Sequence, residues 1–235
     1  MTRKLAIVGM GKMGRAIAEL APSRGWEVVA ELGKDDTGDG IDRARLGGAD
    51  VAVEFTTPIA APENTASILR AGCPVVVGTT GWYPRLAEMS ELASQHKGAL
   101  LTAANFSLGV NIFEQVATLA ARLLARAPGF EAALVETHHS AKKDAPSGTA
   151  ATLERAAAAA WGKPIPITSI RVGAVPGTHE FLFDAPFEQI HLLHMARDRR
   201  VFAEGALVAA GWLIGRQGVF TMRDVLSQSS TGQTS

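Results

Sequence analysis

Two adjacent histidines and two lysines occur within one short stretch, VETHHSAKKDAPSGTAA at residues 135–151. His138 and His139 end an apolar run that is typical of a strand, and Lys142 and Lys143 follow them in a short loop. Neighbouring ammonium groups disfavour protonation of an imidazole, and they attract an anionic substrate. Because a histidine that titrates near neutral pH is suited to proton transfer, the pattern favours acid–base chemistry on a small acid.

Two other interpretations of the histidine pair stay open, a metal site and a structural role. Adjacent residues of a strand point to opposite faces, so His138 and His139 are poorly placed to bind one ion. Glu136 shares the face of His138, but no cysteine or aspartate with ligand-like spacing is near. We therefore predict no metal site, and a structural role for the pair remains the alternative.

The residues after the lysines predict a helix at about 148–162. Ser147 is suited to be its N-cap, since a serine oxygen accepts a hydrogen bond from a backbone N–H group of the first turn. Gly148 and Thr149 would then present further N–H groups at the positive end of the helix, which attracts carboxylates. The whole stretch is thus suited to bind a small acid and to donate protons to it.

A glycine turn near the N-terminus, GMGKMG, indicates a dinucleotide site. Gly9, Gly11 and Gly14 have the G-x-G-x-x-G spacing, and the turn follows an apolar strand at 4–9 and opens a helix. The first glycine permits the tight turn, the second lets the backbone approach a pyrophosphate, and the third allows close packing of helix on strand. The alternative is a tight structural turn in an α/β protein that binds no nucleotide.

The cofactor preference stays open between NADPH and NADH. A carboxylate is expected at the end of the second strand, where it would bind the ribose hydroxyls. Glu31 lies inside that strand, and Lys34 follows it in a loop, where it could pair with a 2′-phosphate or be solvated. Two later loops, at 78–81 and 103–107, follow the ends of strands and are placed to contact a nicotinamide. Each of them could also be an ordinary turn.

Strands alternate with helices along the first half of the chain, which predicts a doubly wound parallel sheet of the Rossmann type. The expected strands are 4–9, 27–32, 49–56, 74–81 and 99–107. We predict that this dinucleotide-binding domain spans 1–106 and is completed by about 201–235.

The pattern changes in the second half, which predicts a separate α+β domain with a mixed sheet at 107–200. A long helix at 111–127 and a strand at 130–139 precede the helix after Ser147. The remaining runs have clear alternation and short connections, so we expect them to be antiparallel strands. These runs are 168–173, 179–185 and 187–196.

Composition argues against several classes of partner. The 235 residues include 23 basic and 23 acidic side chains, so no overall field attracts nucleic acid or an anionic membrane. No apolar run approaches the ~20 residues of a membrane span, and the first apolar run is too short for a secretory signal. The single cysteine, Cys73, cannot form an intrachain disulfide. We therefore expect a cytoplasmic protein.

The stretch that contains the histidines closely resembles the signature of the 4-hydroxy-tetrahydrodipicolinate reductase (dihydrodipicolinate reductase) family. The resemblance covers nearly the whole chain, through GMGKMGR, VVGTTGW, AANFSLGVN, PGTHE and FAEGALVAAGWLIGRQGVFTMRDVL. It implies an NAD(P)-binding domain, a substrate-binding and tetramerisation domain, and a homotetramer. The implied reaction is the NAD(P)H-dependent reduction of a small cyclic dicarboxylate, with loss of its hydroxyl group, in diaminopimelate and lysine biosynthesis.

The resemblance also implies roles for single residues. His138 would be the general acid or base, and Lys142 a second proton donor near the ring nitrogen of the substrate. The implied substrate-binding residues are His139, Ser147, Gly148, Thr149 and Thr80. The implied cofactor-binding residues are Gly9, Met10, Gly11, Lys12, Met13, Gly14, Lys34, Gly78, Thr79, Thr80, Ala103, Ala104, Asn105 and Phe106.

The chain departs from the family pattern after its second strand and near 177–181. Gly33 and Lys34 replace an acidic residue followed by arginine, so the resemblance does not imply which nicotinamide cofactor is preferred. Near 177–181 the chain is shorter than in many members, in the part implied to form the tetramer. Two alternative functions are an imine-reducing amino-acid dehydrogenase, such as an aspartate dehydrogenase, and a dinucleotide-sensing protein without catalysis. The first need not carry the KDAPSGT run, and the second has no use for His138 and Lys142.

Overall fold

The computed structural model of the chain describes residues 2–38 and 40–227, which form two compact units. The first unit runs to Leu108 and resumes at Arg200, and the second is Gly109–Arg199. The end of the predicted first domain, residues 228–235, lies outside the described part of the chain.

The first unit contains a six-stranded sheet in which all pairings are parallel, as predicted. Its strands are β1 (Arg3–Val8), β2 (Trp26–Leu32), β3 (Val51–Glu54), β4 (Val75–Val77), β5 (Ala99–Thr102) and β10 (Gly218–Phe220). Their order in the sheet is β10-β5-β4-β3-β1-β2. The run at 218–227, for which no strand or helix was predicted, supplies the edge strand β10 and the short helix α7 (Met222–Ser227).

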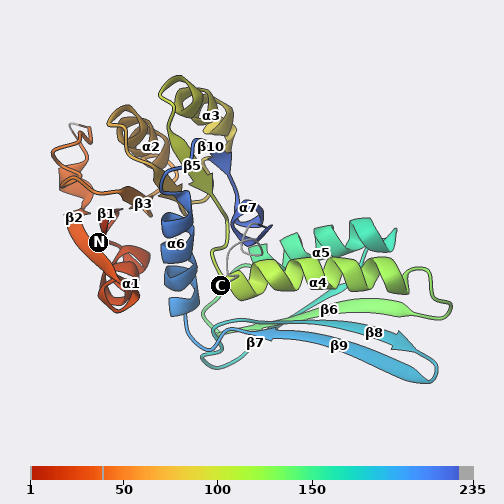
Figure 1. Cartoon of the computed structure of the whole chain (residues 1–235). Helices are drawn as coiled ribbons and strands as arrows, with labels where there is room; N and C mark the ends of the chain where they lie inside the picture. The colour runs from red at the N-terminus through yellow and green to blue at the C-terminus, as the bar shows by residue number, and fades with distance from the viewer. Residues whose placement is uncertain (1, 39, 228–235) are drawn as a thin grey trace, which may run out of the picture. The chain divides into compact units, whose positions relative to one another are not determined.

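Helices cover both faces of this sheet (Figure 1). The helices of the first unit are α1 (Lys12–Leu20), α2 (Ala61–Arg70), α3 (Leu86–Gln95) and α6 (Arg200–Leu213), with short 3-10 turns at Pro22–Arg24, Lys34–Asp36 and Tyr83–Arg85. Since successive strand residues point to opposite faces, Leu5 and Ile7 of β1 pack with α1 and α6. Ala6 and Val8 pack with α2 on the other face. Both faces are therefore dry, which is typical of a parallel sheet.

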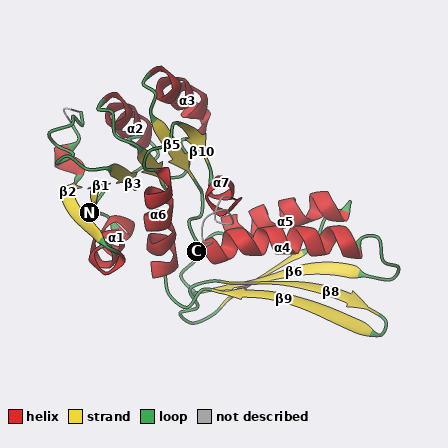
Figure 2. Ribbon diagram, viewed as in Figure 1, coloured by secondary structure: helices red, strands yellow, loops and turns green. Residues whose placement is uncertain are grey.

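The second unit contains a four-stranded mixed sheet with helices against one face (Figure 2). Its elements are α4 (Leu108–Leu124), β6 (Glu131–His138), α5 (Gly148–Trp161), β7 (Ile167–Arg171), β8 (Thr178–Ala185) and β9 (Glu188–Met195). Phe113 of α4 and Trp161 of α5 pack on Phe181 and Phe183 of β8. The mixed sheet is the predicted fold class.

One expectation for the second unit is wrong. Strands β8 and β9 are antiparallel, as predicted, but β7 pairs in parallel with β6. The physical reason is that helix α5 lies between β6 and β7 in sequence. A helix of 14 residues is long enough to return the chain to the starting edge, so the next strand can run in the same direction.

None of the described helices is both long and apolar enough to cross a membrane. Cys73 is a free thiol, and its side chain is buried in the core formed by α2, α3 and their face of the sheet.

Helix α6 provides a matched pair of glycines for a test of packing in the first unit. A Cβ atom at Gly205 would overlap the backbone carbonyl of Phe106, whereas one at Gly211 would overlap the end of the Arg3 side chain and make an ordinary contact with Trp26 at 3.5 Å. We expect Gly205→Ala to lower the free energy of unfolding by about 2 kcal/mol in urea denaturation, because backbone must shift. The control Gly211→Ala should change it by less than about 1 kcal/mol, helped by the better helix propensity of alanine. Equal losses in both variants would contradict this account of the packing.

Candidate functional site

The chain leaves β6 at His138 and enters α5 at Gly148, and Ser147 joins the two elements. Its Oγ accepts a hydrogen bond from Ala150 N–H (3.1 Å), which confirms the predicted N-cap. Its own N–H group donates to Glu136 Oε1 (3.2 Å), and its Oγ lies 3.5 Å from His179 Nε2. The hydroxyl of Ser147 is therefore engaged by the protein. A Cβ atom built at the neighbouring Gly148 would meet no atom within 4 Å, so the start of α5 is open there.

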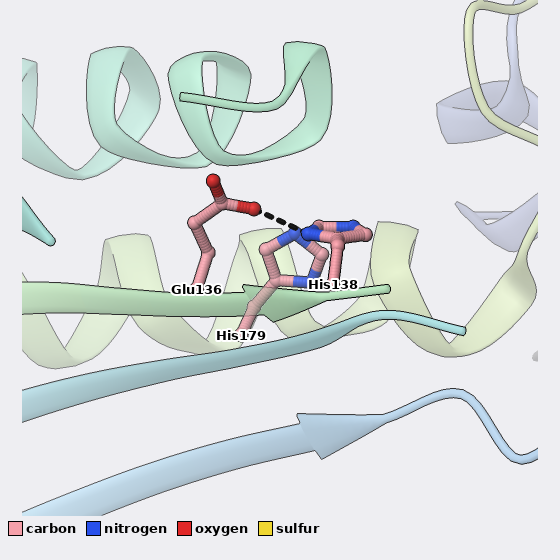
Figure 3. A group of neighbouring side chains, drawn as sticks. All are labelled: Glu136, His138 and His179. Carbon is pink, nitrogen blue, oxygen red and sulfur yellow. Dashed lines mark ion pairs between the residues drawn. The ribbon is translucent and has the colours of Figure 1, made fainter. Parts of the chain in front are cut away.

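A buried group of three side chains lies at the end of β6, made of Glu136, His138 and His179 (Figure 3). Glu136 and His138 are two residues apart and share one face of the strand, and Glu136 Oε2 forms a close ion pair with His138 Nδ1. His179 comes from β8, and its ring meets that of His138 edge-on with 5.3 Å between centroids. Arg171 of β7 donates from Nη2 to Glu136 Oε1 at 2.6 Å.

The charges of this group follow from burial and from these partners. Burial opposes ionisation of Glu136, but hydrogen bonds from Arg171, Ser169 and Ser147 outweigh it and lower the pKa to about 2. Burial lowers the pKa of His179 to about 4, so this imidazole is neutral at neutral pH. Burial also lowers the pKa of His138, and the carboxylate of Glu136 partly offsets that effect. The site thus pairs an ionised acid with an imidazole that can gain or lose a proton.

His179 was not predicted to belong to this group. The residue belongs to β8, far from His138 in sequence, and the two strands meet only through antiparallel pairing. A local signal existed, because His179 alternates with Phe181 and Phe183 on the buried face of β8. A histidine on an apolar face needs a polar neighbour, which here is Ser147.

The donor atoms of Glu136, His138 and His179 lie within 4.8 Å of one another, which is compatible with the spacing of metal ligands. The charges oppose a cation. Arg171 already pairs with the carboxylate, and Lys142 acts on both imidazoles as a positive charge. The arrangement is better suited to hold a proton than a metal ion.

The other residues of the histidine stretch lie in the loop between β6 and α5. Lys142 Nζ pairs with Asp144 Oδ1 at 2.8 Å, and this hydrogen bond lowers the pKa of Asp144. His139 Nε2 lies 3.3 Å from Arg199 Nη2. Lys143 is exposed. The loop therefore presents two ammonium groups, the guanidinium of Arg199 lies beside the imidazole of His139, and Lys142 already binds a carboxylate of the chain itself.

The glycine turn of the first unit has the geometry that a dinucleotide requires. Gly9 has a φ of 101°, and a Cβ atom there would overlap the carbonyl of Phe55. A Cβ atom at Gly14 would overlap the carbonyl of Gly9, which accounts for the close helix–strand packing. At Gly11 a Cβ atom would meet nothing within 4 Å, and no side chain caps the first turn of α1. The first N–H groups of α1 are thus left for phosphate oxygens, and the residues present fit an NAD(P) cofactor.

The loops that follow β4 and β5 surround the ring of Phe55. A Cβ atom at Gly78 would overlap this ring, and the ring of Phe106 lies 5.7 Å from it. Thr79 is buried, and its Oγ1 accepts a hydrogen bond from Thr56 N–H (2.8 Å). The remaining predicted cofactor residues are exposed (Lys12, Lys34, Thr80, Ala104) or partly buried (Met10, Met13, Ala103, Asn105).

Glu54 is a buried acid at the end of β3 that the sequence analysis missed. Its Oε1 accepts from Thr56 Oγ1 and from Asn64 Nδ2 (3.4 Å), while Oε2 has no hydrogen-bond partner among the described residues. Burial raises the pKa of Glu54 more than the hydrogen bonds from Thr56, Thr79 and Asn64 lower it. No cation pairs with it among the described residues, so protonation is the way to keep this group in the core.

Replacement of Glu54 by glutamine tests this assignment. A raised folded-state pKa stabilises the protein below the unfolded pKa, and that stabilisation is lost as pH rises through the folded pKa. The free energy of unfolding of the wild type should therefore fall relative to Glu54→Gln as pH rises from the ordinary carboxyl pKa through the raised pKa of the folded state, by roughly 1.4 kcal/mol for each unit of the pKa difference. Glu27→Gln, on an exposed position of β2, controls for the loss of a surface charge. A difference between Glu54→Gln and wild type that is constant with pH would show that Glu54 is ionised in the fold.

Comparisons with known proteins agree with the resemblance seen in the sequence. The family model "Dihydrodipicolinate reductase, N-terminus" matches residues 3–106, and "Dihydrodipicolinate reductase, C-terminus" matches residues 109–226. The 4-hydroxy-tetrahydrodipicolinate reductase of Christiangramia forsetii is 35% identical over 95% of this chain and 97% of its own length. That of Gluconobacter oxydans is 36% identical over 96% of this chain and 97% of its own.

A solved structure shares the fold. The dipicolinate-bound dihydrodipicolinate reductase of Paenisporosarcina sp. TG-14 superposes with a TM-score of 0.79 at 24% identity, over 95% of this chain and 99% of that one. Two family models that together span most of the chain, and relatives above 30% identity over nearly its full length, lead to one conclusion: this chain belongs to the dihydrodipicolinate reductase family, whose members are NAD(P)H-dependent oxidoreductases.

Proposed function

We propose that this chain reduces 4-hydroxy-tetrahydrodipicolinate to tetrahydrodipicolinate with NADPH or NADH, in diaminopimelate and lysine biosynthesis. One observation supports this function beyond family membership. The buried carboxylate of Glu136 contacts both the imidazole of His138 and the N–H group of Ser147 at the start of α5. A group that can transfer a proton and a helix end that attracts carboxylates are therefore held together by one side chain.

In this proposal, His138 is the general acid or base and Lys142 is a second proton donor near the ring nitrogen of the substrate. The remaining substrate contacts are assigned to His139, Ser147, Gly148, Thr149 and Thr80. Because the hydroxyl of Ser147 caps α5, this residue would contribute by placing the helix end rather than by its own oxygen. The pairing of Lys142 with Asp144 supports the assignment, since a substrate carboxylate can replace that of Asp144 on the ammonium group.

The substrate class is a small cyclic dicarboxylate. The reductase of Paenisporosarcina sp. TG-14 was solved with dipicolinate, a ring with two carboxylates. In this chain, the positive end of α5 and the side chains of Lys142 and Arg199 offer more than one place for a negative group. Loss of the substrate hydroxyl as water consumes a proton, which an imidazolium at His138 can donate.

The first unit would bind the dinucleotide, which supplies the hydride when bound. Gly9, Gly11 and the first turn of α1 would hold the pyrophosphate. Lys34 lies just beyond β2, where a positive charge would favour a 2′-phosphate. The other assigned residues are Met10, Lys12, Met13, Gly14, Gly78, Thr79, Thr80, Ala103, Ala104, Asn105 and Phe106. We also place the reaction in the cytoplasm, where reduced nicotinamide cofactors are available to a biosynthetic step.

A coupled assay tests the proposed function. The substrate is produced in situ by the synthase of the preceding step, and oxidation of NADH and of NADPH is followed in separate reactions. We expect turnover by the wild type, and we expect His138→Gln to lower kcat by about 10²- to 10⁴-fold with a much smaller change in KM, because it removes proton transfer. His96→Gln, on the exposed end of α3, is the control.

Other outcomes would contradict parts of the proposal. Near-normal kcat in His138→Gln would remove His138 from the mechanism. Turnover of NAD(P)+ with aspartate, and none with the cyclic substrate, would identify an amino-acid dehydrogenase. Tight cofactor binding without turnover of any imine would identify a dinucleotide-sensing protein.

We further infer that the protein is a homotetramer whose subunits meet through the open face of the mixed sheet. Helices cover the other face (Figure 2), and apolar side chains remain exposed on this one. Leu193 and Met195 of β9 are 52% and 61% exposed, and Ile170 of β7 is 42% exposed. Leu193 and Met195 lie on one edge strand and Ile170 on the opposite edge strand, so apolar side chains are exposed at both edges of this face, which is typical of a surface that another chain covers.

Light scattering after gel filtration tests the assembly. The wild type should have four times the chain mass of 24.7 kDa. Leu193→Glu should give a smaller species, because a carboxylate would be buried in the interface. Ile59→Glu, at an exposed apolar residue of the first unit, should keep the mass of the wild type. A monomeric wild type, or a Leu193→Glu variant with unchanged mass, would contradict this interface.

A further inference from the structure

The carboxylate of Glu136 is buried and is held from three sides, yet the proposed reaction gives it no task. Its Oε1 accepts from Arg171 Nη2 of β7 (2.6 Å) and from the N–H group of Ser147 at the start of α5 (3.2 Å). These two contacts hold Oε1 in place. The other oxygen, Oε2, is directed at Nδ1 of His138, as Figure 3 shows.

An ionised carboxylate can only accept a hydrogen bond, so its close contact with Nδ1 favours the neutral tautomer of His138 that carries its proton on Nδ1. The lone pair, and the proton that is exchanged, then belong to Nε2. Gly177 lies against this edge of the ring, and a Cβ atom there would come within 3.1 Å of Nε2. A side chain at this position would crowd Nε2, and glycine avoids that contact.

We propose that Glu136 is a positioning residue for proton transfer: it fixes the Nδ1–H tautomer of His138, orients Nε2 as the reacting atom and stabilises the imidazolium. The inference rests on the proposed function, because it assigns a task to Glu136 within the same site. It concerns a residue that does not itself touch the substrate.

The groups around His138 explain why a negative partner is needed. Lys142 of the following loop and Arg171 of β7 both oppose protonation of the imidazole. His179 of β8 meets the ring edge-on and is neutral near pH 7, and His194 of β9 acts in turn on His179. Glu136 favours the imidazolium, and it offsets part of the effect of burial and of the two cations. Without it, His138 would be protonated only at lower pH.

The variant Glu136→Gln provides the test. Its amide oxygen must accept from Arg171 and Ser147, so its NH₂ group would be directed at His138 Nδ1 and would favour the opposite tautomer. We expect kcat to fall about tenfold or more while KM changes little, and the limb of the pH profile that reports His138 to move to lower pH by about one unit. Glu131→Gln, at the exposed start of the same strand, should have the kcat and pH profile of the wild type.

Nitrogen NMR of the histidine rings gives a readout that does not depend on turnover. In the wild type, the His138 signals, assigned with His138→Gln, should be those of an Nδ1–H imidazole. In Glu136→Gln they should change to the Nε2–H form, with a lower titration midpoint. An Nε2–H tautomer in the wild type would overturn the inference even if Glu136→Gln fails to fold. So would a tautomer signal that is lost on treatment with a chelator, since the group would then hold a metal.

The two readouts separate this inference from the proposed function. A wild type that does not reduce the cyclic substrate, but shows the Nδ1–H tautomer and its loss in Glu136→Gln, would refute the function and leave the positioning role of Glu136 in place. An active wild type whose Glu136→Gln variant keeps the kcat, the pH profile and the tautomer would refute the positioning role alone.

Discussion

A charge that is removed from water must be paired and hydrogen-bonded, and the second unit is organised around one such charge. Burial of an ionised carboxylate costs several kcal/mol of desolvation free energy, and interactions within the protein must offset this cost. For Glu136 the compensation comes from Arg171 on β7, from the start of α5 and from His138 on its own strand. These partners meet only in one register, in which Glu136 lies opposite His179 of β8 and His138 opposite Arg171. A slip of one residue would move Glu136 to the open face and leave Arg171 without its carboxylate.

Glu54 and Glu136, the two buried carboxyl groups among the described residues, are accommodated in opposite ways. Glu136 stays ionised because a guanidinium and backbone N–H groups surround it. Glu54 has only hydroxyl and amide partners among its hydrogen bonds, so burial dominates and favours the neutral form. The same side chain therefore acts as a source of charge in one unit and as a neutral link between loops in the other. Burial alone does not determine whether a buried carboxyl group is ionised or neutral, because the charge of its neighbours also shifts its pKa.

Local patterns predicted those features that depend on neighbours in sequence. The alternation of strands and helices gave the parallel sheet, the spacing of Gly9, Gly11 and Gly14 gave the turn before α1, and Ser147 was found as the cap of α5. The features that were missed depend on pairing between distant segments. The direction of β7, the place of β10 at the sheet edge and the contact of His179 with His138 are all decided by which strands become neighbours. In the sequence, Glu54 looks like any polar residue at the end of an apolar strand. Its burial could not be predicted because it depends on residues farther along the chain, Asn64 of α2 and Thr79.

The charges around His138 also connect substrate binding to protonation. Lys142 and Arg171 would attract a dicarboxylate, but the same cations oppose the imidazolium that would donate a proton. Glu136 reduces this conflict without removing it, because Arg171 shares its carboxylate. A bound dianion would place further negative charge near the same cations, and by Coulomb's law it would raise the pKa of His138. The acid would then be charged most fully when the substrate is present, so a group that is largely neutral in the free protein can still serve as the proton donor in the complex.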